Sequence, residues 1–110
     1  LMRPVLYNAT HQLVAVKHVS DSPKELVDVV GPVCESGDTF QREASLPPLG
    51  AGDFVALSSA GAYGAVMASE YNTRPLIPEV LVSDKKFAII RNRPSISEII
   101  MRDKIPVWLT

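Results

Sequence analysis

Residues 25–38 read ELVDVVGPVCESGD, and the rest of the chain is organised around this stretch. Leu26, Val27, Val29 and Val30, which lie on either side of Asp28, are apolar and mostly β-branched. They predict a strand over 25–33, with Pro32 ending its hydrogen-bond ladder. The strand delivers a thiol, Cys34, and a carboxylate, Glu35, to a turn that Gly and Pro residues close on both sides. Because loops mounted on a rigid sheet commonly carry function, residues 31–38 are the first candidate for a site.

Cys34 is the only cysteine in the chain, which excludes an intrachain disulfide and a cysteine-based zinc site. A lone cysteine also fits an inert, buried small hydrophobe. Its place at the end of a strand, beside the polar residues Glu35, Ser36 and Asp38, favours a position near water instead. A neighbouring carboxylate disfavours the thiolate, so the pair favours a neutral S–H that donates a proton over a nucleophile.

The composition bounds the class of protein. At 110 residues we expect a single domain spanning 1–110, with one core. The net charge is −1 and no basic block is present, so we expect no nucleic-acid partner. The uncharged stretch 54–69 is too short to span a membrane, and no signal-peptide pattern opens the chain; we expect a cytoplasmic protein. His11 and His18 lack metal-ligand spacing and are predicted to be structural or surface residues.

Short apolar runs separated by turn residues predict an all-β fold, mainly an antiparallel β-barrel or sandwich of six or seven strands. After a short apolar run at 4–6, a strand is expected over 12–18 and another over 25–33. Residues 39–46 fit either an exposed strand or a loop, and 54–57 are expected to form a buried strand. The last two strands are expected at 79–82 and 87–90, joined by a hairpin turn at 83–86.

Two helical segments are expected among these strands. A short helical turn is predicted near 60–70, where Gly61 and Gly64 would allow close approach; a glycine-rich buried connection is the alternative. A C-terminal helix is predicted near 95–103, because Ser95 and Glu98 have the spacing of a capping box.

Several stretches resemble the motifs of one family. Residues 31–38 resemble its GPxCESGD motif, and residues 1–7 resemble its RPxLY segment. Residues 60–63 (AGAY) and 67–75 (MASEYNTRP) resemble the family's AGAY…MAS-YN-RP segment, and residues 78–82 resemble the strand that follows it. The motifs occur in family order along the chain. The family is diaminopimelate decarboxylase, one of the fold-type-III pyridoxal-phosphate decarboxylases, and CESGD favours this branch over the ornithine branch.

The resemblance implies a two-domain enzyme, with an N-terminal (β/α)8 barrel that binds pyridoxal 5'-phosphate and a C-terminal β domain. This chain resembles the β domain only, so the barrel and its Schiff-base lysine are expected elsewhere and the isolated fragment is expected to be inactive. The family converts meso-2,6-diaminopimelate to L-lysine and CO2 in lysine biosynthesis, at a site shared between two subunits of a homodimer. The alternatives are a non-catalytic binding or regulatory homologue, or a decarboxylase of the same family that acts on ornithine or arginine.

The same resemblance implies a role for individual residues. Cys34 resembles the donor of a proton to the carbanion left by loss of CO2. Glu35 resembles the carboxylate that binds the substrate's distal ammonium group, and Arg3 would bind a distal carboxylate. The remaining candidates are polar contacts: Tyr7 and Ser36 to the substrate, and Tyr71 to both the substrate and the cofactor phosphate.

One position departs from the family pattern. Residue 70 is often asparagine in the family and is glutamate here. A carboxylate facing the cofactor phosphate would repel it, so Glu70 is expected to point away from the site.

Overall fold

The computed structural model describes residues 2–16 and 22–109. His18, predicted to be a structural or surface residue, lies outside the described residues. The chain forms two compact units, Leu1–Ala68 and Ser69–Thr110, and each is described by itself. The first unit contains the candidate loop at residues 31–38, and the second contains Tyr71.

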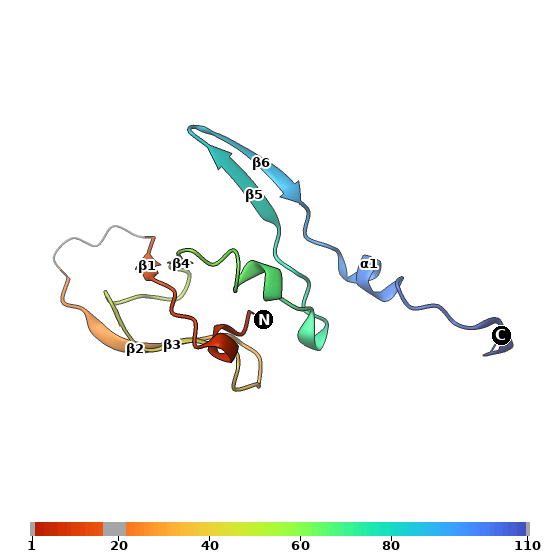
Figure 1. Cartoon of the computed structure of the whole chain (residues 1–110), viewed down its shortest axis with the longest axis horizontal. Helices are drawn as coiled ribbons and strands as arrows, with labels where there is room; N and C mark the ends of the chain where they lie inside the picture. The colour runs from red at the N-terminus through yellow and green to blue at the C-terminus, as the bar shows by residue number, and fades with distance from the viewer. Residues whose placement is uncertain (1, 17–21, 110) are drawn as a thin grey trace. The chain divides into compact units, whose positions relative to one another are not determined.

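The described strands of the first unit pair as two antiparallel ribbons (Figure 1). Strand β1 (Leu13–Ala15) pairs with β4 (Val55–Leu57), and β2 (Glu25–Val30) pairs with β3 (Thr39–Leu46). Strand β1 also contacts β3, so the two ribbons meet. The centre of this unit lies under β3, where Ala44 and Leu46 at alternate positions are buried on one face of the strand.

Two 3-10 helices flank these ribbons. The first, η1 (Pro4–Tyr7), begins with a buried proline, whose fixed φ suits the first helical position and whose missing N–H costs nothing there. It also contacts β3, which places the N-terminal segment against the ribbon that carries the candidate loop. The second, η2 (Ala65–Met67), is the predicted helical turn near 60–70.

Close approach of neighbouring atoms was predicted at Gly61 and Gly64, and it is found at Gly64 only. A Cβ at Gly64 would overlap the Ala60 carbonyl oxygen and the Met2 side chain, so this position needs glycine. A Cβ at Gly61 would meet nothing within 4 Å, so the prediction was wrong there.

The second unit is a hairpin followed by helical turns. Its elements are η3 (Tyr71–Thr73), β5 (Glu79–Ser83), β6 (Lys86–Arg91), α1 (Ile96–Ile100) and η4 (Val107–Leu109). Strands β5 and β6 are antiparallel, and the predicted turn at 83–86 is confirmed, with Asp84 in the left-handed region at φ 53°. No residue in 69–109 is buried. The hairpin and α1 therefore expose most of their apolar side chains.

The predicted fold class is confirmed, since the described chain is mostly antiparallel strand with a few short helices. The strands do not close into a barrel. Closure requires each strand to pair on both edges, whereas the six described strands each pair on one edge, in three two-stranded sheets.

Several element boundaries differ from those expected. Strand β1 is shorter than the expected 12–18, of which residues 17 and 18 lie outside the described part of the chain, and α1 is shorter than the expected 95–103. Strands β5 and β6 are slightly longer than the expected 79–82 and 87–90. Strand β2 ends at Val30 rather than residue 33, because the chain turns at Gly31 to form the loop. Residues 39–46 are a strand. The strand expected to be buried at 54–57 is shorter and half-exposed, with Phe54 74% exposed.

No helix in the described part of the chain is long and apolar enough to cross a membrane.

The capping box predicted at the start of α1 is confirmed. The Ser95 hydroxyl accepts a hydrogen bond from the Glu98 N–H at 3.2 Å, and Glu98 Oε2 accepts one from the Ser95 N–H at 2.7 Å. The pKa of the Glu98 carboxyl lies below its usual 4.5. The hydrogen bond from the Ser95 backbone is the largest cause, followed by the hydrogen bond from the Ser95 side chain, and the positive charge of Arg102 acts in the same direction.

The Ser95–Glu98 capping box is expected to weaken at low pH. Because the pKa of Glu98 is lowered in the folded state, the stabilisation is fully present above pH 4.5 and is lost as the pH falls through the lowered folded-state pKa. The Ser95 amide proton should therefore show an NMR titration step with a midpoint below pH 4.5, and Glu98→Gln should remove the step. A Ser95 shift that does not change with pH, or that changes equally in Glu98→Gln, would contradict the account.

Candidate functional site

The loop between β2 and β3 carries the candidate thiol, as the sequence predicts. Cys34 is exposed, so the interpretation as a buried inert cysteine is wrong for this chain. The loop is closed by backbone hydrogen bonds from the Gly31 N–H to the Asp38 carbonyl (2.8 Å) and from the Asp38 N–H to the Glu35 carbonyl (3.0 Å). Cys34 is thus presented on a defined turn at the end of a strand.

Asp38 holds this loop from inside. Its side chain is buried, at 5% exposure, and its Oδ2 accepts a hydrogen bond from the Val33 N–H at 2.8 Å. The carboxylate lies directly over Gly31, where a Cβ would overlap it. The sequence analysis treated Asp38 only as a polar neighbour of Cys34. The available signal was a glycine at one end of the loop and an aspartate at the other, since aspartate side chains accept hydrogen bonds from nearby backbone in turns.

Glu35 is positioned by two contacts. Its Oε1 accepts a hydrogen bond from the Gly37 N–H at 2.8 Å, and its Oε2 lies 3.4 Å from Nε of Arg3. Gly37 is buried, and a Cβ there would come within 2.9 Å of both Glu35 carboxylate oxygens. The loop therefore turns this carboxylate toward a guanidinium from a distant part of the chain.

Arg3 is brought to Glu35 by the start of η1. Its backbone lies in the left-handed region, at φ 54° and ψ 51°, which is unusual for a residue with a side chain. Such strain persists only where the surroundings impose it, and it concentrates at functional sites. The structure thus brings together two residues that the sequence analysis assigned to the same substrate, one cationic and one anionic.

Tyr7 lies at the other end of η1. Its ring packs on the ring of Tyr63, with centroids 5.5 Å apart and planes tilted by 45°, and both rings stay more than half exposed. The two tyrosines line a hollow of 460 Å³ together with other residues, among them His11 and Ser59. Tyr63 belongs to the AGAY segment, but the sequence analysis did not single it out.

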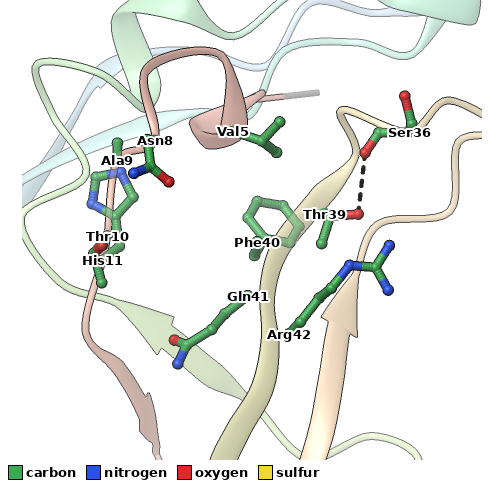
Figure 2. Close-up of a pocket in the computed structure, with 10 residues that line it drawn as sticks. All are labelled: Val5, Asn8, Ala9, Thr10, His11, Ser36, Thr39, Phe40, Gln41 and Arg42. Carbon is green, nitrogen blue, oxygen red and sulfur yellow. Dashed lines mark hydrogen bonds between the residues drawn. The ribbon is translucent and has the colours of Figure 1, made fainter.

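A second hollow, of 410 Å³, lies between the N-terminal segment and β3 (Figure 2). Ser36 lies at its rim, where its carbonyl accepts a hydrogen bond from the Thr39 hydroxyl at 3.2 Å. Arg42 and Gln41 contribute polar groups from β3. His11 lines both hollows and is buried, as expected of a structural residue.

Tyr71 belongs to the second unit and is described by its own surroundings. It is exposed and begins η3, where Asn72 and Thr73 both have left-handed backbone, with φ 57° and 56°. The residue before it, Glu70, forms an ion pair with Arg102.

The chemistry available in the first unit follows from these contacts. The Arg3–Glu35 pair offers one positive and one negative group at the same place, which suits a ligand centre that carries both an ammonium and a carboxylate. The neighbouring Cys34 offers a thiol proton.

Removing the Asp38 side chain tests whether it holds the loop. Asp38→Ala leaves the Val33 N–H without its acceptor in a part-buried place, which should lower the free energy of unfolding by about 1–3 kcal/mol. Asp38→Asn keeps an acceptor oxygen and should lose less. Asp53→Ala is a matched control, because Asp53 accepts a similar bond from the Gly50 N–H in an exposed turn. If urea unfolding shows equal losses for Asp38→Ala and Asp53→Ala, the loop does not depend on Asp38.

Comparison with known proteins identifies the family to which this chain is similar. The sequence pattern of the family described as "Pyridoxal-dependent decarboxylase, C-terminal sheet domain" matches residues 1–61, which include η1, both ribbons and the candidate loop.

Individual relatives match nearly the whole chain. The chain is 50% identical over 110 residues to diaminopimelate decarboxylase of Zymomonas mobilis and 42% identical over 109 residues to that of Archaeoglobus fulgidus, in each case over 99% of this chain and 25% or 26% of the relative. It superposes on the crystal structure of diaminopimelate decarboxylase from M. jannaschii in complex with L-lysine with a TM-score of 0.87 and 37% identity, covering 100% of this chain and 25% of that one. The chain thus spans about a quarter of the length of these relatives. It belongs to the family of pyridoxal-dependent decarboxylases, in their C-terminal sheet domain.

Proposed function

We propose that this chain is the C-terminal β domain of a diaminopimelate decarboxylase, which converts meso-2,6-diaminopimelate to L-lysine and CO2. The relatives that match nearly all of the chain carry this name, and one of them was solved in complex with L-lysine. The observation that carries the proposal is the contact between Arg3 and Glu35 beside the loop that presents Cys34.

The two charges fit the substrate's distal centre. That centre of diaminopimelate carries an ammonium and a carboxylate, and CO2 leaves from the other end, so L-lysine keeps the same zwitterionic centre. Glu35 binds the ammonium and Arg3 binds the carboxylate. Their 3.4 Å contact is longer than the roughly 2.7–2.9 Å of a charge-assisted hydrogen bond, so the two groups attract without being locked together. Ornithine and arginine have a cationic distal group and no distal carboxylate, so neither supplies an anion for Arg3.

The family of this chain is described as pyridoxal-dependent, and Tyr71 offers a group that fits the phosphate of such a cofactor. Tyr71 is exposed, and its phenol O–H is a donor suited to a phosphate oxygen. The lysines of this chain match no cofactor-lysine motif, so a separate N-terminal barrel supplies that residue. Pyridoxal 5'-phosphate, when bound, supplies an electron sink for the loss of CO2.

The chain's own residues orient the substrate and return a proton. With the distal centre held by Arg3 and Glu35, the Cys34 S–H donates its proton to the substrate carbon that has lost CO2. Tyr7 and Ser36 add polar contacts to the substrate. The exposure of Cys34 in this chain leaves room for a barrel to close over the loop, and a second subunit of a homodimer is the proposed source of that barrel.

Replacing the thiol tests the proton-donor role. In the full-length protein, Cys34→Ala should reduce kcat by about 10²–10⁴-fold, because positioned proton transfer contributes that much. Binding of pyridoxal 5'-phosphate, measured by absorbance titration, should remain within twofold of the wild type. A Cys34→Ala variant that keeps near-normal turnover would remove Cys34 from the mechanism.

Replacing the charges tests substrate recognition. Glu35→Gln and Arg3→Gln should each lower kcat/KM for meso-diaminopimelate by about 10–100-fold, the size of a lost hydrogen bond to a charged group. Glu43→Gln is the matched control, because Glu43 is an exposed acid on β3 and should leave kcat/KM unchanged. Equal effects of the Glu35 and Glu43 substitutions would show that Glu35 does not bind substrate.

A further inference from the structure

Glu70 directly precedes Tyr71, and a cation of the second unit lies against its carboxylate. Glu70 Oε2 forms a short hydrogen-bonded ion pair with Nη1 of Arg102. The Glu70 side chain is only 23% exposed, and its other oxygen, Oε1, is closed off from solvent with no hydrogen bond to any described residue. Arg102 is thus the cation that this carboxylate contacts.

Arg102 is held in place by the turn that follows α1. Its N–H donates to the Ile99 carbonyl at 3.3 Å, and its charge also reaches Glu98 one helical turn earlier, where it contributes to the lowered pKa. The segment around Glu70 is held less firmly by packing, because η3 and α1 make no extensive contact with any other described element. The ion pair therefore joins the turn after α1 to the residue that precedes Tyr71.

The backbone after Glu70 is strained. Asn72 and Thr73 are both left-handed, and this is costly for the β-branched Thr73. Strained backbone needs surroundings that impose it, and such segments occur at ligand clamps. Tyr71 sits between the charged pair and this strained turn.

We propose that Arg102 is a positioning and charge-balancing residue for cofactor binding: by neutralising Glu70, it allows the Tyr71 segment to approach the cofactor phosphate. This inference rests on the proposed function, since it takes Tyr71 as a phosphate contact. An uncompensated carboxylate next to Tyr71 would repel the phosphate, whereas the paired one adds little net charge.

A charge cycle in the full-length protein tests this role. The variants are Arg102→Gln, Glu70→Asn and the two together, and the measurement is the Kd of the apoprotein for pyridoxal 5'-phosphate. Arg102→Gln should weaken binding about fivefold, the size expected of one uncompensated charge near a surface. Glu70→Asn should leave binding unchanged or tighten it, because it removes a negative charge. The double variant should return to within twofold of the wild type.

Three controls separate charge from structure. Pyridoxal, which lacks the phosphate, should bind Arg102→Gln and the wild type equally well. Arg102→Lys, which keeps the charge, should bind pyridoxal 5'-phosphate like the wild type. The weakening in Arg102→Gln should also shrink in 0.5 M KCl, because salt screens exposed charges.

The outcomes distinguish the possible failures. If Glu70→Asn weakens pyridoxal 5'-phosphate binding about fivefold relative to the wild type, the pair is only a structural tether and the inference is overturned. This comparison with the wild type stands even if Arg102→Gln fails to fold. Unchanged binding in Arg102→Gln, or an equal loss for pyridoxal, also overturns it. A wild-type protein that binds no pyridoxal 5'-phosphate would instead contradict the proposed function itself.

Discussion

The hydrogen bond from the Val33 N–H to the buried Asp38 carboxylate is the contact on which the candidate site depends. A buried carboxylate must have its oxygens satisfied locally, and here the loop itself supplies a donor. The bond fixes the path of the loop over Gly31, and that path determines where Glu35 turns. Glu35 then meets Arg3 from the start of η1. A single acceptor at the end of the loop thus sets the geometry of residues that lie far apart in the sequence.

The two units each contain an ion pair near a candidate site residue, and the two pairs differ in geometry. In the first, Arg3 at the start of η1 and Glu35 on the loop lie 3.4 Å apart, and in the proposed function each binds the oppositely charged group of one substrate centre. In the second, Glu70 and Arg102 are joined by a short hydrogen bond, and the pair removes a negative charge beside Tyr71. Both pairs are only partly exposed, and the distinction between them lies in the charges they present or cancel.

The sequence predicted the local features better than their assembly. The hairpin turn at 83–86, the Ser95–Glu98 capping box and the turn that presents Cys34 each depend on residues close together in the chain, and all three were predicted. The Arg3–Glu35 contact was predicted only as shared substrate binding inferred from resemblance, because no local pattern encodes a long-range contact. The role of Asp38 was missed, since an aspartate in a turn has the same local signature whether it is buried or exposed. An antiparallel barrel or sandwich was expected because strands follow one another through turns. The described strands instead form three two-stranded sheets, and the pairing of strand edges cannot be read from hydrophobic patterns alone.

We propose that the charges of Arg3 and Glu35 select a substrate with a zwitterionic distal centre. The most direct measurement is CO2 release by the wild-type, full-length protein with added pyridoxal 5'-phosphate, on meso-diaminopimelate, ornithine and arginine at equal concentrations. The account predicts release from meso-diaminopimelate with formation of L-lysine, and at least tenfold slower release from the other two, because neither supplies a carboxylate for Arg3. Faster release from ornithine or arginine, or no release from any of the three, would contradict it.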